Sequence, residues 1–163
     1  MASPDPTLTL SLPLWWCLIR ELRRRGGGVS ESGAFVLGHR QGETAQARRL
    51  VFYDDIDPGA LRTGIVRLSG QAMNAVWETC AREGLEVLAD VHTHPGGAGQ
   101  SRSDKEHPMV ATRGHIALII PNLARSVFDL AGVGHYRYLG AKRWDVLPAP
   151  RLGFLNVQFR GTL

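Results

Sequence analysis

The apolar residues of the N-terminal part recur at helical spacing from Ser11 onward. This one-sided pattern predicts an amphipathic helix, and the glycine run at 26–28 is a typical helix end. A second pattern of the same kind predicts a helix over residues 71–83. The residues expected to face the core are Leu14, Trp15, Leu18, Ile19 and Leu22 in the first helix and Met73, Val76, Trp77 and Cys80 in the second.

Between and after these helices the pattern changes to short apolar or alternating runs, which predict strands. The run at 115–121 is the clearest, because it is short, apolar and stopped by a proline. Residues 108–113 are expected to form a short helix. The predicted strands cover the end of the arm at 1–10 and residues 32–38, 49–55, 86–91, 115–121, 127–130, 135–139, 143–147 and 154–159.

Helices interleaved with strands predict an α/β or α+β fold with a central sheet. The chain has 163 residues, 44% of them hydrophobic and 21% charged, a balance typical of a globular domain. No internal repeat, low-complexity segment or dividing linker is evident, so residues 1–163 are expected to be one domain. Two isolated cysteines, Cys17 and Cys80, are expected to be small core residues rather than a disulfide framework.

The net charge of +4 is too small to indicate nucleic acid by itself. The arginines at 23–25 suggest either a phosphate-binding patch or a solvated helix end that complements the helix dipole, and the second interpretation is favoured. The basic and aromatic residues are not interleaved as in a single-strand-binding platform. No apolar run is long enough for a membrane span, and the basic residues follow the apolar ones rather than precede them, so a cytoplasmic protein is expected.

The segment 90–104, DVHTHPGGAGQSRSD, carries the candidate chemistry. His92 and His94 follow an apolar strand, and alternate residues of an extended chain point to the same side. Asp104 follows a loop rich in glycine and serine that is long enough to fold back. Two imidazole nitrogens and one carboxylate oxygen suit a catalytic Zn²⁺ that keeps its fourth position open.

The order His92-Thr-His94-Pro, then Ser101-x-x-Asp104, resembles the JAMM motif of the JAB/MPN metallopeptidases. The family also carries a glutamate far upstream, just before an apolar strand that ends in glycine, and Glu31 precedes the strand predicted at 32–38. The resemblance implies a single MPN/JAB domain with a central mixed β-sheet flanked by helices, similar to that of cytidine deaminases.

The resemblance also implies a role for each motif residue. Zn²⁺ would be bound by His92, His94 and Asp104. Glu31 would act as general base and then general acid, and Ser101 would donate a hydrogen bond to the oxyanion. The loop at 95–100 has six residues, one fewer than the family pattern, so Ser103 is the alternative oxyanion donor. Glu43 is the next candidate base.

Most members of the family cut after the C-terminal glycine of ubiquitin or a ubiquitin-like protein. The compact size and the sequence DVHTHP look most like bacterial members, which accompany E1-like, E2-like and ubiquitin-like proteins, in some cases in antiviral operons. A precursor or conjugate of a ubiquitin-like protein is therefore the expected substrate. A peptidase for a small sulfur-carrier protein, an MPN scaffold without activity and a nucleic-acid module are the alternatives.

The other histidines are less informative. His39 and His135 are expected at the surface or in turns. His115 begins the central strand, where it could support a metal ligand through a hydrogen bond. His107 lies three residues after Asp104 and could approach the metal, although a structural role is favoured.

Overall fold

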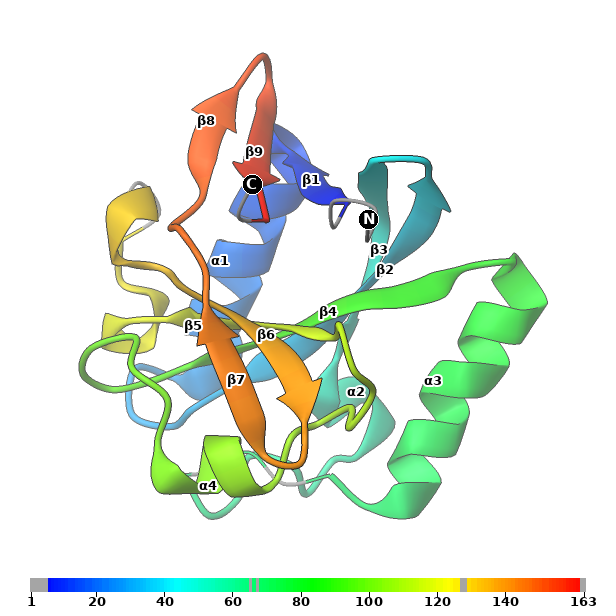
Figure 1. Ribbon diagram of the computed structural model, residues 1–163. Coiled ribbons are helices and arrows are strands. Elements are labelled where there is room, and N and C mark those ends of the chain that lie inside the picture. The colour runs from blue at the N-terminus through cyan, green and yellow to red at the C-terminus, as the bar shows by residue number, and fades with distance from the viewer. Residues whose placement is uncertain (1–5, 65, 67, 127–128, 162–163) are drawn as a thin grey trace.

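A nine-stranded sheet organises the chain in the computed structural model, which describes residues 6–64, 66, 68–126 and 129–161 (Figure 1). The helices are few and mostly short. The elements are β1 (Thr7–Ser11), α1 (Leu12–Gly26), β2 (Gly33–Gln41), β3 (Thr44–Phe52), α2 (Tyr53–Ile56), α3 (Gly70–Glu83), β4 (Glu86–Thr93), α4 (Arg102–Glu106), β5 (Ile116–Ile120), η1 (Asn122–Ala124), η2 (Leu130–Gly132), β6 (Gly134–Gly140), β7 (Arg143–Val146), β8 (Arg151–Gly153) and β9 (Asn156–Phe159).

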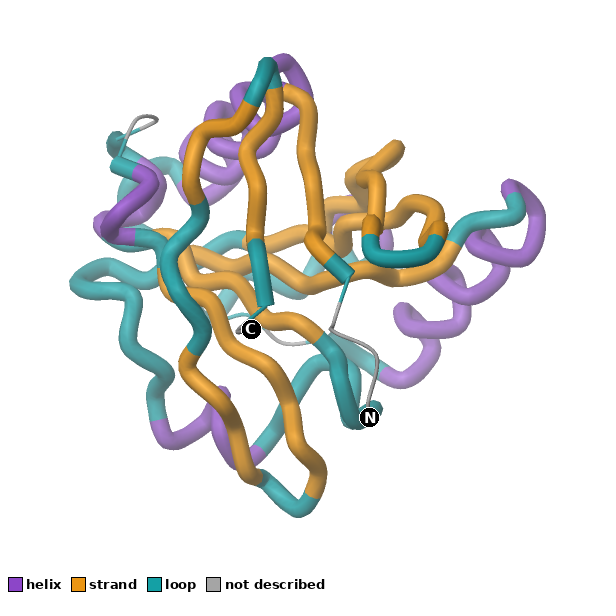
Figure 2. Tube along the Cα trace, turned by 45° about the horizontal axis from the view of Figure 1, so that its top comes forward, coloured by secondary structure: helices purple, strands orange, loops and turns teal. Residues whose placement is uncertain are grey.

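The strand order is β7-β6-β5-β4-β2-β3-β1-β9-β8, and the sheet curls along its length (Figure 2). The pairs β4–β5 and β1–β3 are parallel, and the other neighbours are antiparallel. The expected mixed sheet in an α/β fold is therefore present. β4, which carries the histidine pair, lies between β2 and β5 near the middle of the sheet.

Both faces of the central strands are buried. On β2, Ala34 and Val36 pack with α1, whereas Phe35 and Leu37 pack in a second cluster with Val76 of α3. Since both faces of this part of the strand are covered, the residues at 33–38 form a continuous apolar run rather than an alternating one, and only the last three residues of β2 are polar and exposed. The two predicted amphipathic helices thus lie on opposite faces of the sheet and leave the carboxyl end of β4 free to carry polar groups.

Local signals fix the ends of both long helices. Ser11 caps α1 by accepting a hydrogen bond from the Leu14 amide, and Gly27 ends the helix in the left-handed conformation. In α3, Ser69 caps the first turn by accepting a hydrogen bond from the Ala72 amide, and Gly84 ends the helix in the left-handed conformation. These helices begin and end within a residue or two of their predicted limits.

Several predicted elements are wrong in extent or type. Residues 108–113 are not helical, because the helix of this region is α4, whose first turn is capped by Ser101. The strand predicted at 49–55 begins at Thr44 and ends at Phe52, and Tyr53 starts a helical turn. The strand predicted at 154–159 starts only at Asn156, after a turn. Of the strand predicted at 127–130, residues 127 and 128 lie outside the described residues and Leu130 begins a 3₁₀ turn.

The predicted solvent exposure of three side chains is also wrong. Trp77 was expected in the core but is 44% exposed, because the buried face of α3 is formed by Ala72, Val76 and Cys80. His135 was expected at the surface but is 2% exposed, since it lies within β6 and bonds the Pro148 carbonyl.

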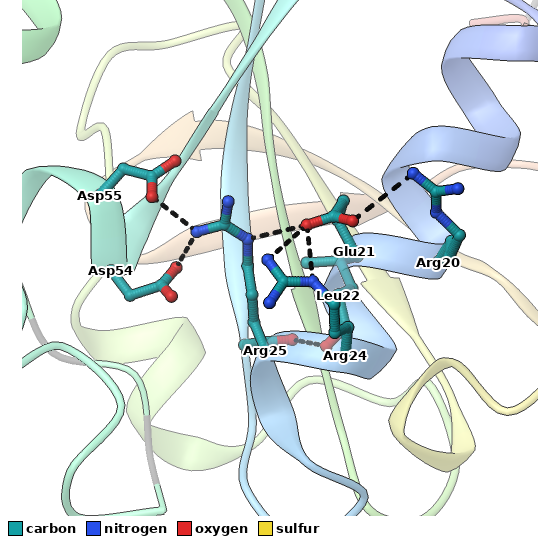
Figure 3. A network of polar contacts seen from close by, with 8 residues as sticks. Arg20, Glu21, Leu22, Arg24, Arg25, Asp54 and Asp55 are labelled. Carbon is teal, nitrogen blue, oxygen red and sulfur yellow. Dashed lines mark hydrogen bonds and ion pairs between the residues drawn. The ribbon is translucent and has the colours of Figure 1, made fainter.

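Arg25 is the third case. Its guanidinium bridges α1 and α2 by contacting Asp54 and Asp55, both at 2.8 Å, and it also pairs with Glu21 (Figure 3). It stacks over Phe52 at 4.1 Å from the ring centroid, and its side chain is only 13% exposed. The end of α1 is therefore anchored to α2 by charged contacts and to β3 by the stacking on Phe52, and it is not simply solvated.

Cys80 is buried, as expected, whereas Cys17 is partly exposed. Within the described part of the chain, no helix combines the length and apolar character that crossing a membrane requires.

Candidate metal centre

Strand alternation builds the first part of the centre. On β4, Ala89 and Val91 belong to the core that packs with α1, so Asp90 and His92 point to the other face. His94 follows directly after the strand. Both histidines are buried, with 7% and 9% of their surface exposed. The expected convergence of the two imidazoles is thus a direct result of the extended backbone.

A strained turn holds the backbone of His94 in place. The His94 amide donates to the Ile120 carbonyl at 3.0 Å, and its carbonyl accepts from the Leu123 amide at 2.8 Å. Asn122, Leu123 and Ala124 all have left-handed backbone angles, with φ between 51° and 59°. Such angles are unfavourable for residues other than glycine, and they persist where the surrounding structure fixes them.

The short helix α4 returns Asp104 to the histidines. Ser101 and Asp104 form a capping box, in which the Ser101 amide donates to Asp104 Oδ2 at 2.6 Å and the Asp104 amide donates to Ser101 Oγ at 3.2 Å. The spacing Ser-x-x-Asp therefore has a structural cause besides any catalytic one. It starts a helix and fixes the direction of the Asp104 carboxylate.

The three predicted metal ligands come together as a tight group. The Nε2 atoms of His92 and His94 are 3.0 Å apart, and each is 3.3 Å from a different oxygen of Asp104. A tetrahedral Zn²⁺ with bonds of 2.0–2.1 Å separates its ligand atoms by about 3.3 Å. Both the donor set and the spacing therefore fit a zinc ion, with one coordination position left for water or substrate.

Electrostatics favour a cation at this point. Burial opposes a charge on His92, but contacts with Asp104 and Asp90 outweigh it and raise the pKa of His92 to about 9. Burial likewise opposes ionisation of Asp104, and the two imidazoles overcome it and hold the pKa of Asp104 far below its usual range. The carboxylates thus stabilise positive charge on the histidine side of the centre, the effect that would favour a bound metal ion.

Glu31 lies beside this group, just before β2. Its amide donates to the Gly64 carbonyl at 3.0 Å, and its carboxylate accepts from the Val66 amide. Partial burial raises the pKa of Glu31, while the nearby His94 and His92 oppose that rise. A half-buried carboxylate with an elevated pKa beside a candidate metal group is a candidate for proton transfer.

Glu31 lines one cavity of about 670 Å³ together with two residues of the metal group, His92 and Asp104. Both candidate oxyanion donors, Ser101 and Ser103, line it as well. Ser101 Oγ accepts a hydrogen bond from the Asp104 backbone N–H. The hydroxyl proton of Ser101 therefore remains available for donation into the cavity. The remaining wall includes the apolar side chains of Leu68, Met73, Met109 and Trp144.

The other predicted candidates are distributed as follows. His107 lines the cavity but is exposed and outside the tight group, and His39 is exposed on β2. His115 is buried and bonds Asp90 at 2.6 Å. Glu43 lies in the turn between β2 and β3, at the opposite end of β2 from Glu31, about 30 Å away along the strand.

Asp90 is the residue that sequence reasoning missed. It lines the same cavity and is only 2% exposed. The signal was available, because the alternation that pairs His92 with His94 also places residue 90 on that face.

Comparison with known proteins gives a partial match. No protein-family model matches the chain. It is 38% identical over 68 residues to the probable metalloprotease y4jG of Sinorhizobium fredii, a match that covers 42% of each protein. The match thus spans less than half of the relative's length.

A solution structure of the Desulfitobacterium hafniense protein DSY2949 has a similar fold. The TM-score is 0.62 at 16% identity, with 86% of this chain and 90% of that protein covered. This likeness shows the fold alone. Together with the partial match, the observations show an α/β protein that is similar over part of its length to a probable metalloprotease and whose His92, His94 and Asp104 form a group able to hold a metal ion.

Proposed function

We propose that this protein is a zinc-dependent peptidase of the JAMM type, formed by a single JAB/MPN domain over residues 1–163. The observation that carries the proposal is the convergence of His92, His94 and Asp104 beside a cavity that His92, Asp104 and Glu31 line. A nitrogen-rich ligand set, an open position and a neighbouring carboxylate are the parts that metal-assisted hydrolysis requires. The similarity to a probable metalloprotease supports the same reaction class.

Each residue of the site has a separate role in the proposed reaction. A zinc ion held by His92, His94 and Asp104 would supply a Lewis acid to water and to the scissile carbonyl. Glu31 takes a proton from the attacking water and delivers it to the leaving amine. The Ser101 hydroxyl donates a hydrogen bond to the carbonyl oxygen as negative charge develops there.

The substrate that we propose is a ubiquitin-like protein, cut after its C-terminal glycine. The loop that follows His94 contains Gly96, Gly97 and Gly99, and a β-carbon at any of them would contact nothing within 4 Å. That open loop leaves room for an extended tail. β7 is one of the two edge strands of the sheet and contributes Trp144 to the wall of the cavity that His92 and Asp104 line, so a tail added along this edge would lie beside that cavity.

The test is a cleavage assay on the purified full chain with zinc. The substrates are a ubiquitin-like precursor that carries residues beyond its terminal glycine, the matching amine-linked conjugate and unfolded casein. Intact mass spectrometry is expected to show a single cut after the glycine, no cleavage of casein and no product with Glu31→Gln. Digestion of casein without cleavage of the precursor would point to a general metallopeptidase and overturn the substrate assignment.

A further inference from the structure

Asp90 is a fully buried carboxylate whose two oxygens face two different histidines. Oδ1 lies 2.6 Å from Nε2 of His115, and Oδ2 lies 3.9 Å from Nδ1 of His92. The side chain of Asp90 is 3% exposed, and those of His115 and His92 are 4% and 9% exposed. The three groups form a row that leads from the start of β5 to the candidate metal.

The burial of Asp90 is costly without compensation. Removing a carboxylate from water is strongly unfavourable unless cationic or hydrogen-bonding partners replace the solvent. Among the ion pairs of the described residues, those of Asp90 are with His115 and His92, and none is with a lysine or arginine. The negative charge of Asp90 therefore faces these two histidines. One of them, His92, presents its Nε2 atom to Asp104 and His94.

The two ring nitrogens of His92 are in different situations. Nε2 belongs to the tight group with His94 and Asp104. Nδ1 is buried and makes no hydrogen bond to any described residue, and the Asp90 carboxylate is its ion-pair partner. A proton on Nδ1 would be stabilised by that carboxylate and would leave the Nε2 lone pair directed at the metal position, which is the tautomer that a ligand through Nε2 requires.

We propose that Asp90 and His115 are positioning residues of the metal centre: Asp90 fixes the tautomer and the ring orientation of His92, and His115 holds Asp90 in place. This inference rests on the proposed zinc site. It assigns a role to a pair that lies 25 residues apart in sequence and belongs neither to the metal-ligand group nor to the proton shuttle.

The register of the sheet makes the arrangement rigid. Asp90 lies opposite Ala117 of β5, and His115 comes immediately before that strand. The His115 carbonyl accepts from the Tyr138 amide at 2.9 Å, which ties its backbone to β6. Neither residue can move without disturbing the centre of the sheet, so the orientation imposed on His92 is fixed before any metal binds.

The test measures zinc affinity by chelator competition and the absorption spectrum of the Co²⁺-substituted protein. Loss of a carboxylate that supports a metal-binding histidine weakens metal binding by about 10- to 100-fold, and Asp90→Asn is expected to show a loss of that size with a shifted Co²⁺ spectrum. His115→Met, which removes the donor to Asp90, is expected to weaken zinc binding by a smaller factor. His115→Gln keeps an N–H donor at nearly the same place and is expected to restore affinity.

The matched control is His135→Asn, because His135 is an equally buried histidine of the same sheet that bonds a backbone carbonyl instead. It is expected to bind zinc as the wild type does. If Asp90→Asn fails to fold, the comparison of His115→Met with His115→Gln decides the inference. Wild-type affinity and spectrum in folded Asp90→Asn or His115→Met would overturn it, whereas a wild-type protein that takes up no zinc would overturn the metal site itself.

Discussion

Gly33 of β2 lies directly opposite His92 of β4 in the antiparallel register, and the ring of Tyr53 occupies the space that a side chain at position 33 would need. A β-carbon there would also come within 2.7 Å of the Val91 carbonyl oxygen. Tyr53 is completely buried, and its burial and the nearby Asp90 charge raise the pKa of its hydroxyl well above the usual range. The missing side chain of Gly33 thus lets the Tyr53 ring pack against β2 at the position that pairs with His92.

Gly33→Ala is therefore expected to destabilise the protein and to weaken zinc binding, because the ring or the β2–β4 pairing must shift. Overfilling of a packed core typically costs about 1–3 kcal/mol. Urea unfolding measures the stability, and chelator competition measures the zinc affinity. Gly97→Ala is the control, since its β-carbon would contact nothing within 4 Å. Equal stability of the two variants would contradict the packing argument.

Zinc is expected to bind at about one ion per chain and to stabilise the folded state. A ligand present at 100 times its dissociation constant adds about 2.7 kcal/mol to the free energy of unfolding. Asp104→Asn is expected to lose most of this gain, because a side-chain amide is a weak zinc ligand. The asparagine oxygen can still accept the hydrogen bond from the Ser101 backbone N–H, so the helix cap is kept. Glu106→Ala, on the same helix and paired with Arg102, is expected to respond like the wild type. Thermal unfolding with and without zinc tests this, and an undiminished zinc effect in Asp104→Asn would move the metal elsewhere.

Glu31→Gln is expected to reduce turnover by about 10²- to 10⁴-fold, the usual contribution of a general acid–base residue. Its zinc content is expected to stay unchanged, since Glu31 is outside the tight ligand group. Glu43→Gln is the matched control because Glu43 lies in the distant β2–β3 turn. Kinetics on a precursor substrate, with metal analysis of each variant, make the measurement. Near-normal turnover in Glu31→Gln would assign the proton transfer to another group.

Ser101→Ala is expected to lower kcat by about 100-fold or more with a smaller change in KM, because an oxyanion donor acts most strongly in the transition state. Ser101 also caps α4, so the variant should in addition lose roughly 1 kcal/mol of stability. Ser101→Thr keeps the hydroxyl and the cap and is expected to recover both properties. Ser103→Ala is expected to remain active, and a larger loss there than in Ser101→Ala would make Ser103 the donor.

The parts of the fold that could be predicted from sequence are those fixed by short-range signals. Ser11 and Gly27 delimit α1, and the i, i+2 spacing of His92 and His94 aims both rings at one point. The helix predicted at 108–113 lies too late in the chain, because a metal-site interpretation of Ser-x-x-Asp does not by itself indicate the helix α4 that starts there. The same four residues are also a capping box, which predicts a helix start at Ser101.

The features that sequence could not predict depend on partners far along the chain. The side chain of Arg25 is only 13% exposed because Asp54 and Asp55 lie across from it, about 30 residues later. His115 meets Asp90 only through the parallel register of β4 and β5. No local pattern specifies either pairing, since both arise when the sheet assembles.

The burial of His135 predicts how the free energy of unfolding depends on pH. It packs edge-on against Phe159, and its Nδ1 donates to the Pro148 carbonyl at 2.9 Å. Burial lowers the pKa of His135, and the hydrogen bond to Pro148 only partly opposes that shift. The unfolded chain, with a histidine pKa near 6.5, therefore binds this proton more readily than the folded protein does.

The sign of the effect follows from that difference. The stability associated with neutral His135 is fully present above pH 6.5 and is lost as the pH falls toward the lower pKa of the folded state. His135→Asn keeps a donor for Pro148 but cannot titrate, so its free energy of unfolding should fall less than that of the wild type between pH 7.5 and pH 5. The measurement is chemical unfolding of the metal-free forms of both proteins at a series of pH values. His39→Asn, at an exposed position, should keep the wild-type pH dependence, and the same dependence in His135→Asn would show that burial of His135 does not control its proton.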